Sequence, residues 1–259
     1  MCELFGMSSL VPTGVTLSLA RLARHGNSAA RLGDGWGVAY HDGRAVRLIK
    51  EPEPAEASPW VDFLERQQVR GAVVLAHIRH ATQGATGLAN TQPFVRALGG
   101  RMHAFAHNGN LAGLPEPPGG ARFRPVGETD SEAAFALLLA RLAPLWEDGV
   151  PRVAQRQAAV AAVAAELRRH GPANFLYTDG ECLFAHADRR TQADGRIASP
   201  GLHMLHRSCA TDAEALAAAG IGLGAAQTVT LFASVPLSDE DWRPLPAGTL
   251  CLARAGVPG

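Results

Sequence analysis

Apolar residues in this chain recur with two periods, and each period predicts one type of element. Residues 71–79 (GAVVLAHIR) are almost continuously apolar, which is typical of a strand buried on both faces. Shorter runs of strand character are separated by turn residues such as 41–43 (HDG). The predicted strands span residues 2–9, 35–40, 44–50, 71–79, 101–107, 173–178, 182–187, 202–207, 227–234 and 249–253.

Four other segments favour helices. The clearest begins at residues 129–132 (TDSE), a capping-box sequence placed just before the apolar run AAFALLLARL. Residues 114–127 are rich in Pro and Gly and are predicted to form a loop. The predicted helices span residues 15–25, 60–68, the segment that begins at 129–132, and 152–169. Because strands flank a block of two long helices, the order predicts an α+β layered sandwich rather than alternating βαβ units.

Composition narrows the classes of protein that fit this pattern. The chain has 259 residues, with 24 Lys and Arg against 24 Asp and Glu. A formal charge of zero argues against a nucleic-acid binder, which needs clustered positive charge. Hydrophobic residues make up 47% of the chain and charged residues 19%, so extended disorder is excluded and part of the surface is expected to be covered in a homo-oligomer.

The chain shows no signal for a membrane or for secretion. No apolar run approaches the roughly 20 residues that a transmembrane helix needs, and the N-terminal residues lack the basic and apolar regions of a signal peptide. We therefore expect a cytoplasmic protein without membrane contact. Its four cysteines, Cys2, Cys182, Cys209 and Cys251, are isolated and expected to be reduced. Cys182 and Cys251 lie in strand-like runs and are interpreted as small core residues.

Cys2 differs from the other cysteines because removal of Met1 would give it a free α-amine beside its thiol. The reference pKa of an α-amine is about 7.7–8.0, so part of it is neutral at pH 7 and can take the thiol proton. The resulting thiolate is a strong nucleophile, and one residue then supplies both nucleophile and base. The alternative is a cysteine that lies in an N-terminal strand by chance.

Cys2 is the first of four motifs along the chain. Cys2 is followed by residues 79–84 (RHATQG), 107–110 (HNGN) and 127–132 (GETDSE), with an early Gly-rich segment at 34–38 (DGWGV). Together and in this order they resemble the class II glutamine amidotransferases, which are N-terminal-nucleophile hydrolases. The opening residues (CELFGMSS) and residues 124–132 (RPVGETDSE) most resemble the small, stand-alone bacterial branch. The resemblance implies a four-layer αββα sandwich and a single domain over residues 2–259.

The resemblance also implies an activity and a set of site residues. Cys2 would attack the carbonyl of a γ-glutamyl amide and form a γ-glutamyl thioester, with no cofactor and no metal. The Asn108 side chain and the Gly109 N–H would stabilise the oxyanion. Arg79 would bind the α-carboxylate of the substrate, helped by Thr82, and Asp130 would bind its α-ammonium.

Other interpretations of these residues remain open. Arg79 could be a surface residue at a strand end, and Asp130 could cap a helix. Asn108-Gly109 is also the strongest signal for a type I′ hairpin turn. Four histidines, His77, His80, His103 and His107, raise a metal hydrolase as a rival, although side chains alternate between the faces of a strand and His77 and His80 should therefore diverge.

Two functional questions also stay open at this stage. The protein could bind glutamine as a sensor without turning it over. Within the enzyme hypothesis, it could be a glutaminase that supplies ammonia to a separate synthase subunit, or a hydrolase of γ-glutamyl compounds. The family's domain uses nearly the whole chain, so we expect any synthase to be a partner chain. Relatives fused to a synthase commonly have His-Pro where this chain has Gln92-Pro93, so the surroundings of the substrate differ.

Overall fold

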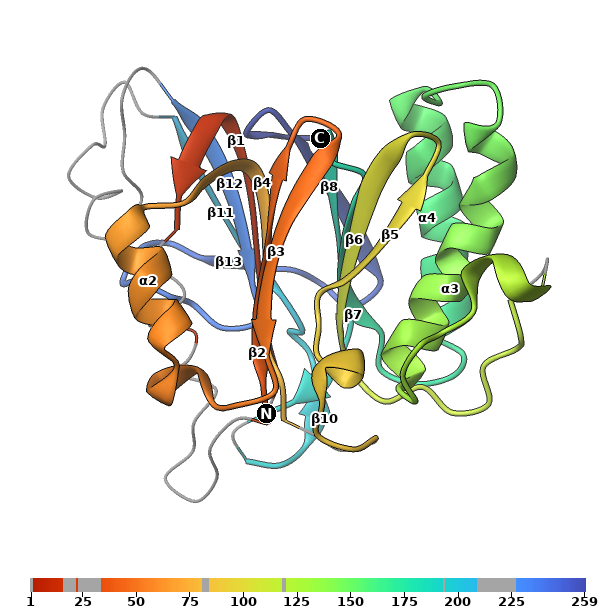
Figure 1. Ribbon diagram of the computed structural model, residues 1–259, viewed down its shortest axis with the longest axis horizontal. Coiled ribbons are helices and arrows are strands. Elements are labelled where there is room, and N and C mark those ends of the chain that lie inside the picture. The colour runs from red at the N-terminus through yellow and green to blue at the C-terminus, as the bar shows by residue number, and fades with distance from the viewer. Residues whose placement is uncertain are drawn as a thin grey trace.

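Two antiparallel sheets pack face to face, and helices cover the outer face of each (Figure 1). This computed structural model describes residues 2–15, 22, 34–80, 84–117, 120–192, 194–208 and 227–259. One helix lies on the outer side of the first sheet, and two longer helices lie on the outer side of the second (Figure 1). The four layers are those of the expected αββα sandwich.

The first sheet contains the strand that follows Cys2, β1 (Glu3–Gly14), which pairs with β4 (Arg70–Ile78) on one side and β12 (Thr228–Ala233) on the other. Its outer face packs on helix α2 (Pro59–Gln67), whose Leu64 is fully buried. The Ser58 hydroxyl caps this helix by accepting a hydrogen bond from the Trp60 N–H at 3.2 Å. The strands in sheet order are β13 (Arg243–Pro244), β11 (His203–Ser208), β12 (Thr228–Ala233), β1 (Glu3–Gly14), β4 (Arg70–Ile78), β2 (Trp36–Asp42) and β3 (Ala45–Glu51).

The second sheet carries the predicted oxyanion segment at the end of one of its strands, β6. Its outer face packs on α3 (Asp130–Leu142) and α4 (Val153–Leu167). The strands in sheet order are β15 (Val257–Pro258), β14 (Thr249–Arg254), β8 (Cys182–Ala187), β7 (Asn174–Thr178), β6 (Arg101–Asn108) and β5 (Phe94–Leu98). A separate short pair is formed by β9 (Arg190–Thr191) and β10 (Ile197–Ala198). Single-turn helices lie at Ala55–Ala57, Leu88–Asn90, Gly120–Phe123 and Ala143–Trp146.

The layer between the sheets is built from small and aliphatic side chains. Gly6 lies at its centre, where a Cβ atom would come within 3.0 Å of Leu176 Cδ1 and 3.2 Å of Leu183 Cδ2. Because protein interiors are close-packed, even one methyl group here would force side chains or the sheets to move. Gly6 therefore helps to set how closely the two sheets approach.

Most predicted elements are confirmed, with small shifts at their ends. The predicted helix at 15–25 and Cys209 lie wholly or largely outside the described residues. Five strands have no counterpart among the predicted elements: β5, β9, β10, β13 and β15. The β5 strand is short, follows Pro93 and carries Arg96, and β13 and β15 have two residues each, so their patterns are too brief to detect. No helix in the described ranges is long and apolar enough to cross a bilayer.

Three buried histidines make the core sensitive to acid. His41, His77 and His103 are almost completely buried, and burial lowers their pKa values to about 4, 3 and 4 respectively. Tyr177 Oη lies 2.7 Å from His103 Nδ1, and Leu98 O accepts from His103 Nε2 at 3.1 Å. Among the described residues, neither ring nitrogen of His77 has a hydrogen-bond partner. All three are therefore neutral in the folded protein near pH 7.

We expect stability to fall as the pH drops below about 6.5. The unfolded chain binds protons at its histidines near that pH, whereas the folded chain does not, so each histidine costs about 1.4 kcal/mol per pH unit down to about pH 4. Urea unfolding at pH 7, 6 and 5 measures this slope. His77→Leu should make it shallower by about one histidine's share, and equal slopes for the variant and the wild type would contradict the assignment.

Candidate active site

Cys2 lies directly before β1 and contacts His80, two residues beyond the end of β4. The His80 N–H donates to Cys2 Sγ at 3.1 Å, and the thiol donates to His80 O at 3.2 Å. Burial raises the pKa of the Cys2 thiol, while the His80 N–H and the nearby Arg79 lower it and Glu3 raises it. Because burial is the largest of these effects, the thiol needs a base before it can act as a nucleophile at neutral pH.

Asn108 joins the ends of the two sheets at this point. Its Nδ2 donates to Cys2 O at 2.6 Å, although 106 residues separate the two in the sequence. A Cβ atom on Gly109 would lie 1.9 Å from Pro172 O, so only glycine fits there. The hairpin interpretation of Asn108-Gly109 is wrong, because residues 109–117 form no strand and the chain continues through a loop towards α3.

His107 fixes the end of β6 from both its backbone and its ring. Gln92 Oε1 accepts from the His107 N–H at 2.6 Å, and Gln92 Nε2 donates to His107 O at 3.2 Å. His107 Nε2 donates to Pro172 O at 3.2 Å, so Nδ1 accepts from the Ser131 hydroxyl at 2.9 Å. Burial lowers the pKa of His107, which keeps the ring neutral. These bonds hold the position of Asn108, the next residue.

The four histidines do not assemble a metal site in the described part of the chain. There, the one group of three ligand atoms close enough to share an ion comes from Asp179, Glu181 and Cys182. The Arg156 guanidinium already donates to Asp179 at 2.7 Å and to Glu181 at 2.9 Å. This acidic group is therefore neutralised by a protein cation and lies at the end of β7 that is remote from Asn108.

Asp130 is the first residue of α3, and its carboxylate contacts the loop that follows Gly109. Oδ2 accepts from the Leu111 N–H at 2.6 Å, and Oδ1 accepts from the Ser131 N–H at 2.8 Å. The N-cap residue of the helix is Thr129, whose Oγ1 accepts from the Glu132 N–H at 3.2 Å, and Asp130 contributes a second acceptor to the free N–H groups of the first turn. The half-buried carboxylate is also an anion that links the helix start to the oxyanion loop.

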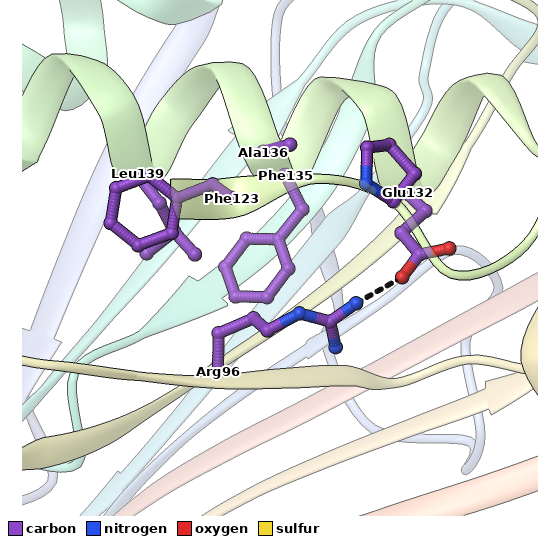
Figure 2. Close-up of a pocket in the computed structure, with 7 residues that line it drawn as sticks. Arg96, Phe123, Glu132, Phe135, Ala136 and Leu139 are labelled. Carbon is purple, nitrogen blue, oxygen red and sulfur yellow. Dashed lines mark hydrogen bonds and ion pairs between the residues drawn. The ribbon is translucent and has the colours of Figure 1, made fainter. Parts of the chain in front are cut away.

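Glu132 links the first turn of α3 to strand β5 through an ion pair. Figure 2 shows its carboxylate pointing towards the Arg96 guanidinium, with which it forms an ion pair. Its other oxygen accepts from the Gly127 N–H at 2.7 Å. The expected capping box therefore forms only in half, because Glu132 binds Gly127 and Arg96 rather than the backbone of Thr129. Two partners for one buried carboxylate fix where α3, and with it Asp130, begins.

Asn90 connects the loop after the Arg79 motif to the loop before α3. Its Oδ1 accepts from the Glu128 N–H at 2.8 Å, and its Nδ2 donates to Ala85 O at 2.9 Å. A Cβ atom on Gly127 would lie 2.2 Å from Asn90 Oδ1, which accounts for the glycine that opens the GETDSE motif. The two loops that carry predicted substrate-binding residues are thus held to one another.

Arg79 is buried at the end of β4 and is not a surface residue. Its side chain is almost fully enclosed, and Nη2 donates to Gly84 O at 3.2 Å. Its backbone pairs with the segment before β2, where its N–H donates to Gly35 O at 2.8 Å and its carbonyl accepts from the Asp34 N–H at 2.8 Å. Arg79 is adjacent to His80, which contacts Cys2. Thr82 lies outside the described residues.

Of the predicted site residues, Cys2 contacts Asn108 directly and Arg79 adjoins the Cys2 contact. Asp130 accepts from Leu111 in the loop that begins at Gly109. Sequence reasoning missed the backbone-binding amides of Gln92 and Asn90. The one signal for Gln92 was its departure from the His-Pro of the fused relatives.

Comparisons with known proteins agree with this geometry. A family model described as class-II glutamine amidotransferases matches residues 1–258. The protein YafJ of Escherichia coli (strain K12) is 36% identical over 259 residues, which cover 96% of this chain and 95% of YafJ. A crystal structure of a predicted glutamine amidotransferase from Pseudomonas aeruginosa PA01 is 31% identical, with a TM-score of 0.70 and 99% of both chains covered.

A more distant structure shows the fold alone. Glutamine phosphoribosylpyrophosphate amidotransferase from B. subtilis has 16% identity and a TM-score of 0.58, and this chain matches 48% of its length. With this likeness, the four-layer sandwich of the N-terminal-nucleophile hydrolases is confirmed. The chain therefore belongs to the class-II glutamine amidotransferases, a family that hydrolyses the glutamine amide with an N-terminal cysteine.

Proposed function

We propose that the protein hydrolyses a γ-glutamyl amide in the cytoplasm, with Cys2 as its nucleophile. The observation that carries this proposal is the contact of 2.6 Å between Asn108 Nδ2 and Cys2 O. It brings a nucleophile and an amide donor, from different sheets, to one point. Amide hydrolysis needs this pairing, because the nucleophile creates an oxyanion that a donor must stabilise.

Removal of Met1 begins the proposed mechanism, since it converts the Cys2 nitrogen into an amine. The amine takes the thiol proton, which the buried thiol does not lose readily by itself. The thiolate then attacks the γ-carbonyl carbon, and the Cys2 S–C bond forms as the carbonyl oxygen becomes an oxyanion. The Asn108 amide has two N–H donors, so one can bind Cys2 O while the other, with the Gly109 N–H, binds the oxyanion.

The intermediate collapses when its C–N bond breaks. The α-ammonium of Cys2 returns the proton to the leaving nitrogen, which departs as ammonia or an amine. Water then attacks the γ-glutamyl thioester, releases glutamate and restores the thiol. Arg79 binds the α-carboxylate of the substrate and Asp130 its α-ammonium, with Thr82 as a further contact to the carboxylate.

The leaving group decides between two roles. Free ammonia from glutamine would suit a separate synthase subunit, whereas a larger amine would mark a hydrolase of γ-glutamyl compounds. We propose the second, because Gln92-Pro93 stands where synthase-fused relatives commonly have His-Pro, and Gln92 here is committed to binding the backbone of His107. We also propose that the protein forms a homo-oligomer, because charged residues make up only 19% of the chain and part of its surface is expected to be covered.

The test is a panel of L-glutamine, γ-glutamyl dipeptides and γ-glutamyl amines, with glutamate release measured for each. We expect turnover of at least one γ-glutamyl amine or peptide faster than of glutamine. Glutamine as the best substrate would favour the ammonia-supplying role. Tight binding of these compounds without glutamate release would indicate a sensor and overturn the proposal.

Arg79→Ala should reduce kcat/KM by about 10²-fold, mainly through KM, because a buried charge-assisted clamp on the α-carboxylate is lost. Arg141→Ala is the matched control, since it removes an arginine from the last turn of α3, where it pairs with Glu166 at 3.4 Å, and leaves the clamp intact. Steady-state kinetics on the best substrate of the panel measure both. A change under about threefold for Arg79→Ala would show that its clamp role is wrong.

A further inference from the structure

A buried ion pair lies beside the nucleophile and is not used in the mechanism above. Arg190 Nη1, from β9, donates to Glu3 Oε2 at 2.7 Å, and both residues are buried. The Ser234 hydroxyl also donates to this carboxylate. The same Ser234 oxygen accepts from the Leu4 N–H at 2.9 Å, and the Ser234 N–H donates to Leu4 O at 3.0 Å. These bonds fix the two residues that follow Cys2.

Asn174, at the start of β7, fixes the other side of the site. It is fully buried, and its Nδ2 donates to Arg189 O at 2.5 Å and to Asn108 O at 3.4 Å. Its Oδ1 accepts from the Asp188 N–H at 2.6 Å. A Cβ atom on Gly201 would lie 1.6 Å from Asn174 Oδ1, so the amide of Asn174 fits only because residue 201 of this chain is a glycine.

The two sets of contacts close into a ring. Arg189 and Arg190 are adjacent, so the segment that receives the Asn174 amide also supplies the cation for Glu3. From Glu3 the chain leads back to Cys2, and Asn108 Nδ2 donates to Cys2 O. We define the positioning ring as Cys2, Glu3, Arg190, Arg189, Asn174 and Asn108.

We propose that Glu3 is a positioning residue for catalysis, which acts through this ring to hold Cys2 against the oxyanion donor Asn108. The inference rests on the proposed function, because it takes Cys2 as the nucleophile. Burying two charges is costly unless both are paired and hydrogen-bonded, and a well-packed apolar pair is often as stable. Stability alone therefore does not account for a carboxylate at this position.

The charge of Glu3 gives the proposal a specific signature. The Glu3 carboxylate raises the pKa of the Cys2 thiol, and Arg79 lowers it. The other titratable group beside the Glu3–Arg190 pair is His203 on β11, whose pKa is lowered by burial and by Arg190. Arg190 therefore neutralises a negative charge that would otherwise oppose thiolate formation.

The experiment compares Glu3→Gln, Arg190→Met and the double variant with the wild type on the best substrate. Glu3→Gln should lower kcat about tenfold, because Cys2 is displaced relative to Asn108. KM should be nearly unchanged, because Arg79 and Asp130, which bind the substrate, stay in place. The acidic limb of the profile of kcat/KM against pH should move to lower pH in Glu3→Gln, which loses the negative charge. It should move to higher pH in Arg190→Met, which leaves that charge unpaired.

The double variant keeps the test valid if Arg190→Met does not fold. It buries no unpaired charge, so it should fold, return the acidic limb close to its wild-type position, and retain a reduced kcat. Arg156→Lys is the matched structural control, since it perturbs a similarly buried ion pair at the far end of β7 and should change stability without changing kcat or the limb. Loss of structure alone cannot move the limb in opposite directions.

Two outcomes separate this inference from the proposed function. A kcat within about twofold of wild type in Glu3→Gln, with an unmoved acidic limb, would reduce Glu3 to a structural residue and overturn the inference. Full activity in Cys2→Ala would instead overturn the proposed function, whatever the Glu3 variants show.

Discussion

Cys2→Ala is expected to lower the rate of γ-glutamyl amide hydrolysis by roughly 10⁴-fold or more, because the nucleophile and the covalent intermediate are both lost. Glutamate release under saturating substrate measures the loss. KM is expected to change little, since the carboxylate and ammonium of the substrate bind elsewhere. Cys251→Ala is the matched control: it removes a half-buried thiol from β14 and should keep full activity.

A second arm of this experiment separates the thiol from its base. A lysine inserted between Met1 and Cys2 keeps the thiol but makes the second residue large. Met1 is then retained, because its removal requires a small second residue. We expect this variant to be as inactive as Cys2→Ala. Intact-mass spectrometry should show Met1 absent from the active wild type. Full activity in a preparation that retains Met1 would contradict the role of the α-amine.

Asn108→Ala is expected to lower kcat by about 10²–10³-fold, the usual effect of removing one oxyanion donor. KM should stay within about threefold, because the ground-state carbonyl gains little from this donor. The variant also loses the hydrogen bond to Cys2 O, so displacement of the nucleophile must be distinguished from loss of the donor. The rate at which iodoacetamide alkylates Cys2 makes that distinction.

An unchanged alkylation rate together with a reduced kcat would assign the effect to the oxyanion. If alkylation slowed in parallel with kcat, Asn108 would act mainly by holding Cys2. A kcat within about threefold of wild type would show that Asn108 is not an oxyanion donor at all.

The layers of the fold could be predicted because each main element has its own local signal. The continuous apolar run before Arg79 indicated a doubly buried strand, and β4 is the strand between β1 and β2. The residues TDSE indicated the start of α3, and Thr129 caps it. The strands that escaped detection, such as β5, are short or carry proline and charge.

The meeting of Cys2 and Asn108 could not be predicted from periodicity, because no local pattern relates residues that are 106 positions apart. Resemblance to the family supplied that pairing. The amide of Asn174 escaped both routes, and the only signal for Gln92 was its departure from the His-Pro of the fused relatives, because each amide binds backbone groups of distant segments and leaves no periodic trace. Arg190 and Ser234, which bind the Glu3 carboxylate, could not be predicted for the same reason.

The close approach at Gly6 gives the reaction a dependence on a residue with no reactive group. Cys2 precedes a strand of one sheet and Asn108 ends a strand of the other, so their contact depends on how closely the sheets approach at that end of the sandwich. A side chain at Gly6 would act as a wedge four residues from the thiol, against Leu176 and Leu183. We therefore expect that repacking the hydrophobic layer around Gly6 would alter the contact between Cys2 and Asn108 without changing any residue that binds the substrate.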